Sequence, residues 1–142
     1  FDTWLKGFGL EAAGYLIDLV QQLSAQPPVY LDENEIRAVE KAKTILQASL
    51  KHPPAVIDLC RKVGVNKNKL QKGFRLTEGK SVAEYVRTLR MERALDLLED
   101  DTLSIQDVAE KVGYNGISNF YAVFRQTFGD TPAAIQKLLE TK

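Results

Sequence analysis

The sequence is short of the side chains that most often carry enzyme chemistry. Its single cysteine, Cys60, excludes an internal disulfide and a zinc site built from several thiolates. Its single histidine, His52, stands beside Pro53 and Pro54, where we expect a solvated turn residue rather than a metal ligand or a general base. The sequence also lacks a nucleophile–base pair, a phosphate-binding glycine loop and metal-ligand spacing. We therefore predict that the protein is not an enzyme and uses no metal and no cofactor.

Long hydrophobic stretches are missing as well. No apolar run is long enough to span a bilayer, and the chain does not open with the basic and then apolar stretch of a secretory signal. These absences predict a cytoplasmic protein with no membrane partner. The first residue is Phe1 rather than methionine, so we expect the sequence to be part of a longer protein.

The chain has no net charge, because 19 basic residues balance 19 acidic ones. That balance hides two blocks of opposite sign. Residues 61–93 hold ten Lys or Arg against three Glu, a net charge of +7. Residues 96–130 hold two basic residues against seven acidic ones, a net charge of −5. The first block therefore keeps a nucleic acid open as a partner, despite the neutral total.

The sequence is helix-forming throughout, because apolar residues recur at intervals of three and four and strand-like alternation never persists. The predicted fold class is all-α. Caps and breakers set the helix limits: a capping box at Asp32 and Glu35, caps at Asn66, Asn115 and Ser104, and stops at Gly79 and Gly129. The expected helices span about 10–25, 32–51, 55–63, 66–78, 81–99, 104–112 and 115–129, and a last one starts at Thr131-Pro132.

The first of these helices has the spacing of a short coiled-coil seam. Ala12, Leu16, Leu19 and Leu23 follow a 4-3-4 pattern. The pattern is shorter than three heptads, so a homodimer seam and packing against another domain both stay open.

The middle and the end of the chain repeat each other. After a shift of 49 residues, "VIDLCRKVGVN" (56–66) falls on "IQDVAEKVGYN" (105–115). The match resumes after one inserted residue, with Phe74-Arg75 on Phe124-Arg125 and Gly79 on Gly129. A match of this length indicates an internal duplication.

Each copy has the pattern of a helix-turn-helix, in which a short helix, a glycine turn and a second helix follow one another. Gly64 and Gly113 permit the positive φ that is needed where the first helix ends. Cys60 and Ala109 fall where the two helices cross, so we expect a small and buried side chain at both positions.

The second helix of each copy is expected to turn one face outwards. Phe120, Phe124 and Phe128 recur at i, i+4 and i+8 and are assigned to the core. The outward face carries Lys67, Asn68, Gln71, Lys72 and Arg75 in the first copy, and Ile117, Ser118, Tyr121, Ala122 and Arg125, after Asn115 in the turn, in the second. Asn and Gln can bond adenine, while Lys and Arg can donate to guanine or phosphate. Two such motifs, one of them strongly basic, predict double-stranded DNA as the partner.

Four stretches of the chain resemble the DNA-binding domain of the AraC/XylS family of bacterial transcription regulators. They are "DLCRKVGVNKNKLQKGFR", "SVAEYVRTLRMERALDLL", "SIQDVAEKVGYN" and "FYAVFRQTFGDTP". The resemblance covers about residues 36–140. It implies two homeodomain-like helix-turn-helix lobes, at about 55–78 and 104–128, inside a DNA-binding domain of residues 31–142 that one extra helix precedes.

The resemblance also implies that a long helix over about 81–99 joins the two lobes. At about 1.5 Å per residue such a helix is roughly 28 Å long, close to the 34 Å of one DNA turn. The two reading helices would then enter successive major grooves on one side of the duplex. Arg87, Arg90 and Arg93 lie on the joining helix, where we expect some to contact phosphate and others to pair with acidic neighbours.

Carried over by position, the base readers implied by the resemblance are Asn68, Gln71 and Lys72 in the first lobe, and Ile117, Ser118, Tyr121 and Ala122 in the second. The second lobe departs from the family pattern, because members commonly carry a basic residue where Ala122 stands and often an arginine where Gln136 stands. This lobe is also acidic overall. We therefore predict unequal lobes, of which the first anchors and reads DNA and the second contributes weakly or through DNA shape.

The resemblance implies further partners for the longer protein. Members usually have a separate sensing or dimerising domain, so residues 1–30 are expected to be its tail or a linker, and the small-molecule effector site then lies outside this chain. Members are sequence-specific DNA-binding regulators and most often activators of transcription, so the resemblance implies that role here; a contact with RNA polymerase and a homodimer are compatible with it. The main alternative is a helical protein-interaction module that has lost DNA binding, which the acidic second lobe motivates; an enzyme would need an unforeseen cleft of carboxylates.

Overall fold

The computed structural model describes residues 13–22 and 30–141, and these residues contain helices and no strands. The chain divides into two units, Phe1–Leu31 and Asp32–Lys142. In the first unit, residues 13–22 are helical and exposed along their whole length. Ala12 and Leu23 of the predicted seam lie outside the described residues. None of the described helices is both long and apolar enough to cross a membrane.

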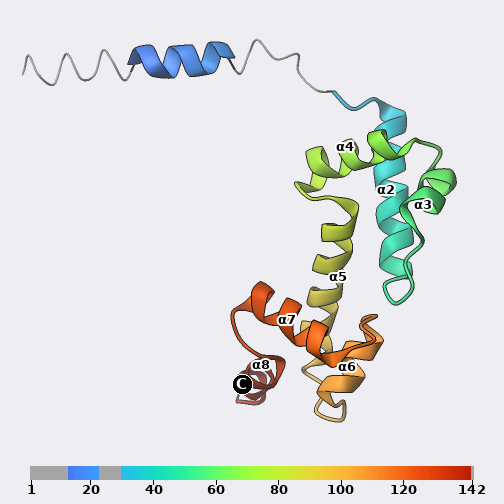
Figure 1. The fold of residues 1–142 in the computed structure, drawn as a ribbon, viewed down its shortest axis with the longest axis vertical. Helices are drawn as coiled ribbons and strands as arrows, with labels where there is room; N and C mark the ends of the chain where they lie inside the picture. The colour runs from blue at the N-terminus through green and yellow to red at the C-terminus, as the bar shows by residue number, and fades with distance from the viewer. Residues whose placement is uncertain (1–12, 23–29, 142) are drawn as a thin grey trace, which may run out of the picture. The chain divides into compact units, whose positions relative to one another are not determined.

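The second unit is an all-α domain whose helices follow the predicted order (Figure 1). They are α2 (Glu33–Ala48), α3 (Val56–Val63), α4 (Lys67–Glu78), α5 (Val82–Leu97), α6 (Ile105–Lys111), α7 (Ile117–Phe128) and α8 (Pro132–Glu140). Figure 1 shows α5 running between α2–α4 at one end and α6–α8 at the other. The predicted architecture of two helical lobes on one joining helix is therefore confirmed.

Most helix starts follow from capping residues that are visible in the sequence. Asp32 accepts a hydrogen bond from the backbone N–H of Glu35 at 2.7 Å, and the Glu35 carboxylate accepts one from the N–H of Asp32 at 3.1 Å. Ser81 forms the same reciprocal capping box, and so does Ser104, at the starts of α5 and α6. The helix predicted to reach residue 51 ends earlier, at Ala48, because Ser49 leaves the helical conformation with φ −128°.

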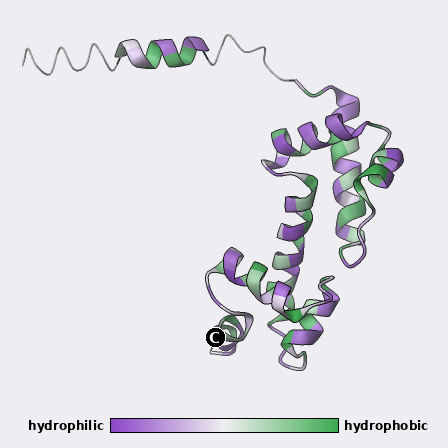
Figure 2. Cartoon of the chain, in the orientation of Figure 1, coloured by the Kyte–Doolittle hydropathy of each residue, from purple (hydrophilic) through white to green (hydrophobic). Residues whose placement is uncertain are grey.

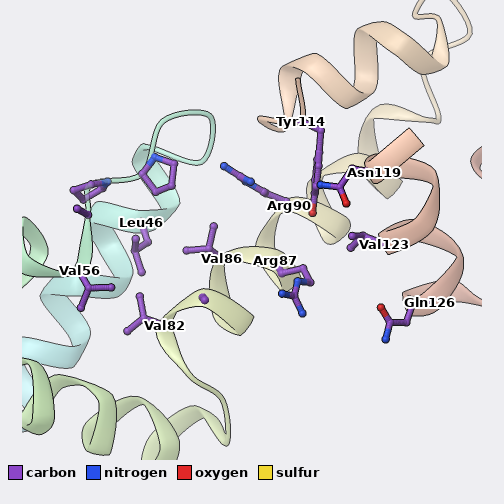
Figure 3. Close-up of a pocket in the computed structure, with 14 residues that line it drawn as sticks. Leu46, Val56, Val82, Val86, Arg87, Arg90, Tyr114, Asn119, Val123 and Gln126 are labelled. Atoms are coloured by element: carbon purple, nitrogen blue, oxygen red, sulfur yellow. The ribbon is translucent and has the colours of Figure 1, made fainter. Parts of the chain in front are cut away.

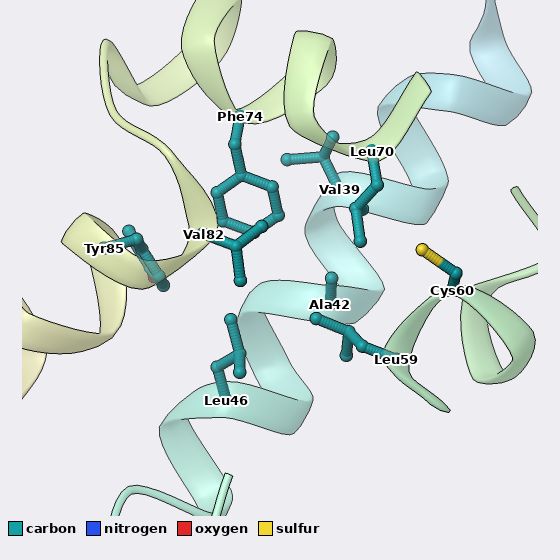
Figure 4. Packing of buried hydrophobic residues seen from close by; sticks show 9 residues of the cluster. All are labelled: Val39, Ala42, Leu46, Leu59, Cys60, Leu70, Phe74, Val82 and Tyr85. Atoms are coloured by element: carbon teal, nitrogen blue, oxygen red, sulfur yellow. The ribbon is translucent and has the colours of Figure 1, made fainter. Parts of the chain in front are cut away.

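The first lobe closes around a core of aliphatic side chains with one aromatic pair. Figure 4 shows residues of α2, α3, α4 and the start of α5 converging on this core. Leu46, Leu59, Leu70 and Phe74 are fully buried, and the Phe74 ring meets the Tyr85 ring edge-on at 5.3 Å. Cys60 is buried beside them, so the prediction of a small interior side chain at this position is confirmed.

The second lobe has its own core, which is richer in aromatic rings. Phe120 and Phe124 are fully buried with ring centroids 5.7 Å apart, and Phe128 packs on Phe124 at 4.7 Å. Met91 and Ala94 of α5 belong to this second core, whereas the N-terminal turns of α5 belong to the first. Figure 2 shows hydrophobic and hydrophilic residues mixed along each helix, as expected when each helix buries only one face.

The joining helix α5 therefore contributes side chains to two separate cores. It spans 16 residues and is therefore roughly 24 Å long. The helix begins one residue later and ends two residues earlier than predicted, because Ser81 is its N-cap and Leu98 its C-cap.

Helix α4 of the first lobe lies directly against α2 at Gly73. A Cβ atom built at Gly73 would stand only 2.5 Å from Cγ2 of Val39, a side chain that is 1% exposed. Because Val39 is β-branched and buried, it has little freedom to move away. The glycine therefore allows α4 to pack more closely on α2 than any residue with a side chain would.

We expect Gly73→Ala to lower the free energy of unfolding by about 1–2 kcal/mol, because overpacking outweighs the gain in helix propensity. Urea unfolding followed by far-UV circular dichroism measures the change. Val39→Ala in the same chain removes the contacted methyl group, so the double variant should lose less than the sum of the two single losses. A Gly73→Ala chain as stable as its parent would contradict the close packing.

A charged contact also ties α4 to α2. Nζ of Lys43 lies 2.7 Å from the carboxylate of Glu78, and both side chains are largely covered. This hydrogen bond raises the pKa of Lys43, with a further contribution from Glu40. The pair fixes the C-terminal end of α4 and complements the close contact at Gly73.

Candidate nucleic-acid interface

The two helix-turn-helix units share one turn geometry. In the first, the N–H of Val65 donates to the carbonyl of Cys60 at 3.3 Å; in the second, the N–H of Tyr114 donates to that of Ala109 at 2.9 Å. Gly64 and Gly113 have φ of +79° and +101°, which residues with a side chain rarely adopt. The equivalent bonds and glycines confirm that the sequence repeat is a structural repeat.

Helix α4 presents a basic and polar face above its buried stripe. Asn66 caps the helix by accepting from the N–H of Lys69 at 2.8 Å, as predicted. Four predicted DNA-contacting residues are exposed on α4: Lys67, Asn68, Lys72 and Arg75. This face combines amide and cationic donors on one helix, which are the groups that read base edges and phosphates in a major groove.

Gln71, the fifth candidate on α4, has a hydrogen-bond partner inside the protein. Its side chain is half-buried, and its carbonyl oxygen accepts from the backbone N–H of Val82 at 3.1 Å. Val82 is the first residue of α5, and the N–H groups in the first turn of a helix have no partner within that helix. This bond uses the carbonyl oxygen and not the NH₂ group of Gln71, and it links α4 to the joining helix.

Helix α7 presents a less polar and less charged face. Ser118, Ala122 and Arg125 are exposed, and Ile117 is 39% exposed. Tyr121 is half-buried, and its ring meets that of Phe120 edge-on at 6.4 Å. The only basic residue within α7 is Arg125.

The prediction that Asn115 caps this helix is wrong. The N-cap is Gly116, with no capping hydrogen bond from a side chain, and Asn115 lies exposed one position before it. The cause is the one residue inserted in the second copy, Gly116, which separates Asn115 from the helix start. In the first copy nothing intervenes, so Asn66 reaches the N–H of Lys69.

Two polar residues that the sequence analysis did not single out, Asn119 and Gln126, line a cleft between the lobes. A cleft of about 560 Å³ separates the lobes, and Arg87 of α5 lines it together with Asn119 and Gln126 of α7 (Figure 3). Its floor includes Val86 and Val123. Asn119 and Gln126 lie opposite the phenylalanine stripe at 100° per residue, so a helical wheel centred on that stripe would have identified them.

Comparison with known proteins identifies the fold and the family. A family model described as a helix-turn-helix domain matches residues 59–138, more than half of the chain. The msm operon regulatory protein of Streptococcus mutans is 28% identical over 131 residues, covering 89% of this chain and 47% of that protein. The transcriptional activator RhaR of Pectobacterium atrosepticum is 31% identical over 114 residues, covering 80% of this chain and 39% of that protein. This chain belongs to the AraC/XylS family.

A solved structure agrees with the AraC/XylS assignment at the level of the fold. The crystal structure of an AraC-type DNA-binding regulator from Chromobacterium violaceum superposes with a TM-score of 0.68 at 24% identity. The match covers 72% of this chain and 91% of that one. In sequence, by contrast, the chain spans less than half the length of the two curated relatives that it matches.

Charge is distributed unequally between the two lobes of this AraC/XylS-family chain. The acidic residues of the second lobe that surround the start of α6 are exposed, and two of them are held ionised by local hydrogen bonds. The hydroxyl and N–H of Thr102 lower the pKa of Asp100, and the N–H and hydroxyl of Ser104 lower that of Asp107. These hydrogen bonds favour the ionised form of both carboxyl groups, while Lys67, Lys72 and Arg75 of α4 are exposed.

Proposed function

We propose that this chain is the DNA-reading part of a transcription regulator that grips one face of a duplex through α4 and α7. The observation that carries the proposal is the exposed face of α4, where Lys67, Asn68, Lys72 and Arg75 stand over fully buried Leu70 and Phe74. The same helix-turn-helix geometry recurs in the second lobe. Gln71 and Lys72 with Asn68 would read bases, and Lys67 with Arg75 would hold phosphates.

The second reading surface is proposed to consist of Ile117, Ser118, Tyr121 and Ala122, with Asn115 and Arg125 beside them. The half-burial of Tyr121 and the small side chain of Ala122 leave few donors for base edges. The two lobes would therefore contribute unequally, and the second would act mainly through apolar contact and DNA shape.

Selection from a pool of random duplexes tests the function directly. The purified chain should enrich one sequence, bind it with a Kd below about 1 μM, and lose affinity steeply as salt rises. A chain that enriches no sequence and binds all duplexes equally would contradict the proposed reading of bases.

A third DNA contact is proposed in the cleft between the lobes. Arg87, Asn119 and Gln126 line this cleft, and we propose that the sugar–phosphate backbone runs there as it passes from one major groove to the next. Two arginines line the cleft, of which Arg87 is exposed and Arg90 is half-buried, so the phosphate contact is assigned to Arg87.

We expect Arg87→Ala to weaken binding to all sequences alike and to reduce the slope of log K against log salt by about 0.9, the value for one phosphate contact. Fluorescence anisotropy titrations at several salt concentrations measure the slope. Arg93→Ala, on the same helix and exposed but outside the cleft, is the matched control and should leave the slope unchanged. Equal slopes for the parent and for Arg87→Ala would show that Arg87 does not contact a phosphate.

For the longer protein, we propose that residues 1–30 are the tail of a sensing or dimerising domain, or a linker to it, followed by the DNA-binding domain of residues 31–142. A small-molecule effector would act through that other domain. Activation of transcription, with a contact to RNA polymerase, fits the description of RhaR as an activator. The 4-3-4 spacing of the first helix supports a homodimer, and the cytoplasm is the compartment that such a regulator requires.

A second candidate function is a protein-interaction module that has lost DNA binding. The observation in its favour is the acidic and exposed surface of the second lobe, where Glu99, Asp101 and Glu110 join the two carboxylates described above. The duplex selection separates the two functions, because an interaction module would enrich no sequence.

A further inference from the structure

Arg90 of α5 is bound to the first lobe by a directed hydrogen bond. The residue lies near the middle of the joining helix and is half-buried. Its Nε donates to the carbonyl oxygen of Leu50 at 3.1 Å. Leu50 follows α2, so this bond connects the middle of α5 to the loop between α2 and α3 of the first lobe.

The same guanidinium is in contact with the second lobe. Its carbon lies 5.3 Å from the centroid of the Tyr114 ring, within the range of a cation–π contact. Tyr114 is 8% exposed and belongs to the second core, at the turn between α6 and α7. Figure 3 shows Arg90 reaching across the space between the lobes, with Tyr114 beside it.

The turn itself lies close to both Arg90 and the first lobe. A Cβ atom built at Gly113 would stand 2.8 Å from Nη2 of Arg90 and 3.0 Å from the carbonyl oxygen of Lys51. Only a residue without a side chain leaves room for this approach. The turn of the second helix-turn-helix therefore lies against the loop that follows α2, and the Arg90 guanidinium lies at this junction between the lobes.

We propose that Arg90 is a positioning residue that fixes the orientation of the two lobes and thereby sets the number of base pairs between their contact regions. A cleft lies between the lobes on the side of α7, and α5 contributes side chains to both cores. The guanidinium suits the role because it is planar and permanently charged, and it can donate in its plane while stacking on a ring. The consequence for DNA rests on the proposed function, whereas the consequence for lobe orientation does not.

Three substitutions separate this role from others. Arg90→Met keeps an unbranched stem and removes the donors and the charge. Arg90→Lys keeps the charge but loses the planar contact with Tyr114 and the directed bond to Leu50. Arg93→Met, one turn away on the exposed side, is the matched control. Circular dichroism melts of all three confirm that each chain is folded under the assay conditions.

The DNA test uses the duplex selected by the parent chain and two derivatives with one base pair inserted or deleted between the contact regions. One base pair moves the far region by about 3.4 Å along the duplex and turns it by about 34°. The parent should lose about tenfold in affinity on either derivative, as for a mismatched base pair. Arg90→Met and Arg90→Lys should bind the selected duplex more weakly than the parent does. Their affinity should fall less than about threefold on the two derivatives, because lobes that are no longer held in one orientation can adapt to each spacing. A phosphate-contacting role would instead lower affinity equally at every spacing, and Arg90→Lys would largely restore it.

A distance measurement tests lobe orientation without DNA. Spin labels go on Thr77→Cys in α4 and Thr127→Cys in α7, which are exposed and equivalent in the two copies, with Cys60→Ala in the background. The parent and Arg93→Met should give one narrow distance distribution, and Arg90→Met should give a distribution at least twice as wide. An unchanged width, or an unchanged preference for spacing, overturns the inference. If the parent binds no duplex, the proposed function fails. The width of the distance distribution between the spin labels then decides whether Arg90 fixes the orientation of the lobes.

Discussion

Replacing Phe124 by alanine should lower the free energy of unfolding by about 3–5 kcal/mol, a loss comparable with the total stability of a small domain. Phe124 is fully buried and packs on Phe120 at 5.7 Å and on Phe128 at 4.7 Å. Removing the ring opens a cavity among side chains from α5, α6 and α7, which are connected to the rest of the domain and can only partly close it.

The loss should be confined largely to the second lobe, because the two cores share no buried side chain. Urea unfolding gives the magnitude, and hydrogen exchange gives its location. We expect amides of α6 and α7 to lose protection while those of α2 and α4 keep most of theirs. Ile117→Ala, at a 39% exposed position on the same helix, is the control and should cost less than about 1 kcal/mol. Equal loss of protection in both lobes would show that they unfold as one unit.

Lys72→Ala should weaken binding to the selected duplex more than Tyr121→Ala. Lys72 is exposed on the basic face of α4, and removing a direct contact to a base edge costs about 1–3 kcal/mol, or roughly 5- to 150-fold in Kd. Tyr121 is half-buried against Phe120, so much of its side chain serves the core rather than DNA. We expect its loss to raise Kd less than about fivefold once the folded fraction is taken into account.

Anisotropy titrations on one duplex, at one salt concentration, compare the two variants. Lys69→Ala is the control for the loss of a positive charge from α4, because Lys69 is exposed but lies away from the reading face. It should change affinity for specific and non-specific duplexes alike. A larger effect of Tyr121→Ala than of Lys72→Ala would reverse the predicted order of the two lobes.

The helices and the duplication could be predicted because their determinants are local in sequence. Capping residues such as Ser81 and Ser104 form hydrogen bonds within three residues, and Gly79 and Gly129 end helices through their own backbone conformation. Such features do not depend on which helices pack against each other. The error at Asn115 arose because a single inserted residue moved the helix start to Gly116.

The contacts that position the candidate site could not be predicted, because they join residues far apart in the chain. The sequence marks Gln71 as an outward-facing polar residue, but its carbonyl oxygen accepts from Val82, eleven positions away. Nε of Arg90 donates to the carbonyl oxygen of Leu50, forty positions away, and its guanidinium makes a cation–π contact with Tyr114. Its sequence context had suggested a phosphate or an acidic neighbour instead. Periodicity identifies the exposed face of a helix but not which of its side chains another element will use.

The most direct test of the central claim is methylation interference on the selected duplex, in which each guanine is modified at N7 on its major-groove edge. The account predicts two clusters of interfering guanines about one helical turn apart on one face, with the stronger effects in the cluster that Lys72→Ala weakens. A single cluster, or two on opposite faces of the duplex, would contradict it.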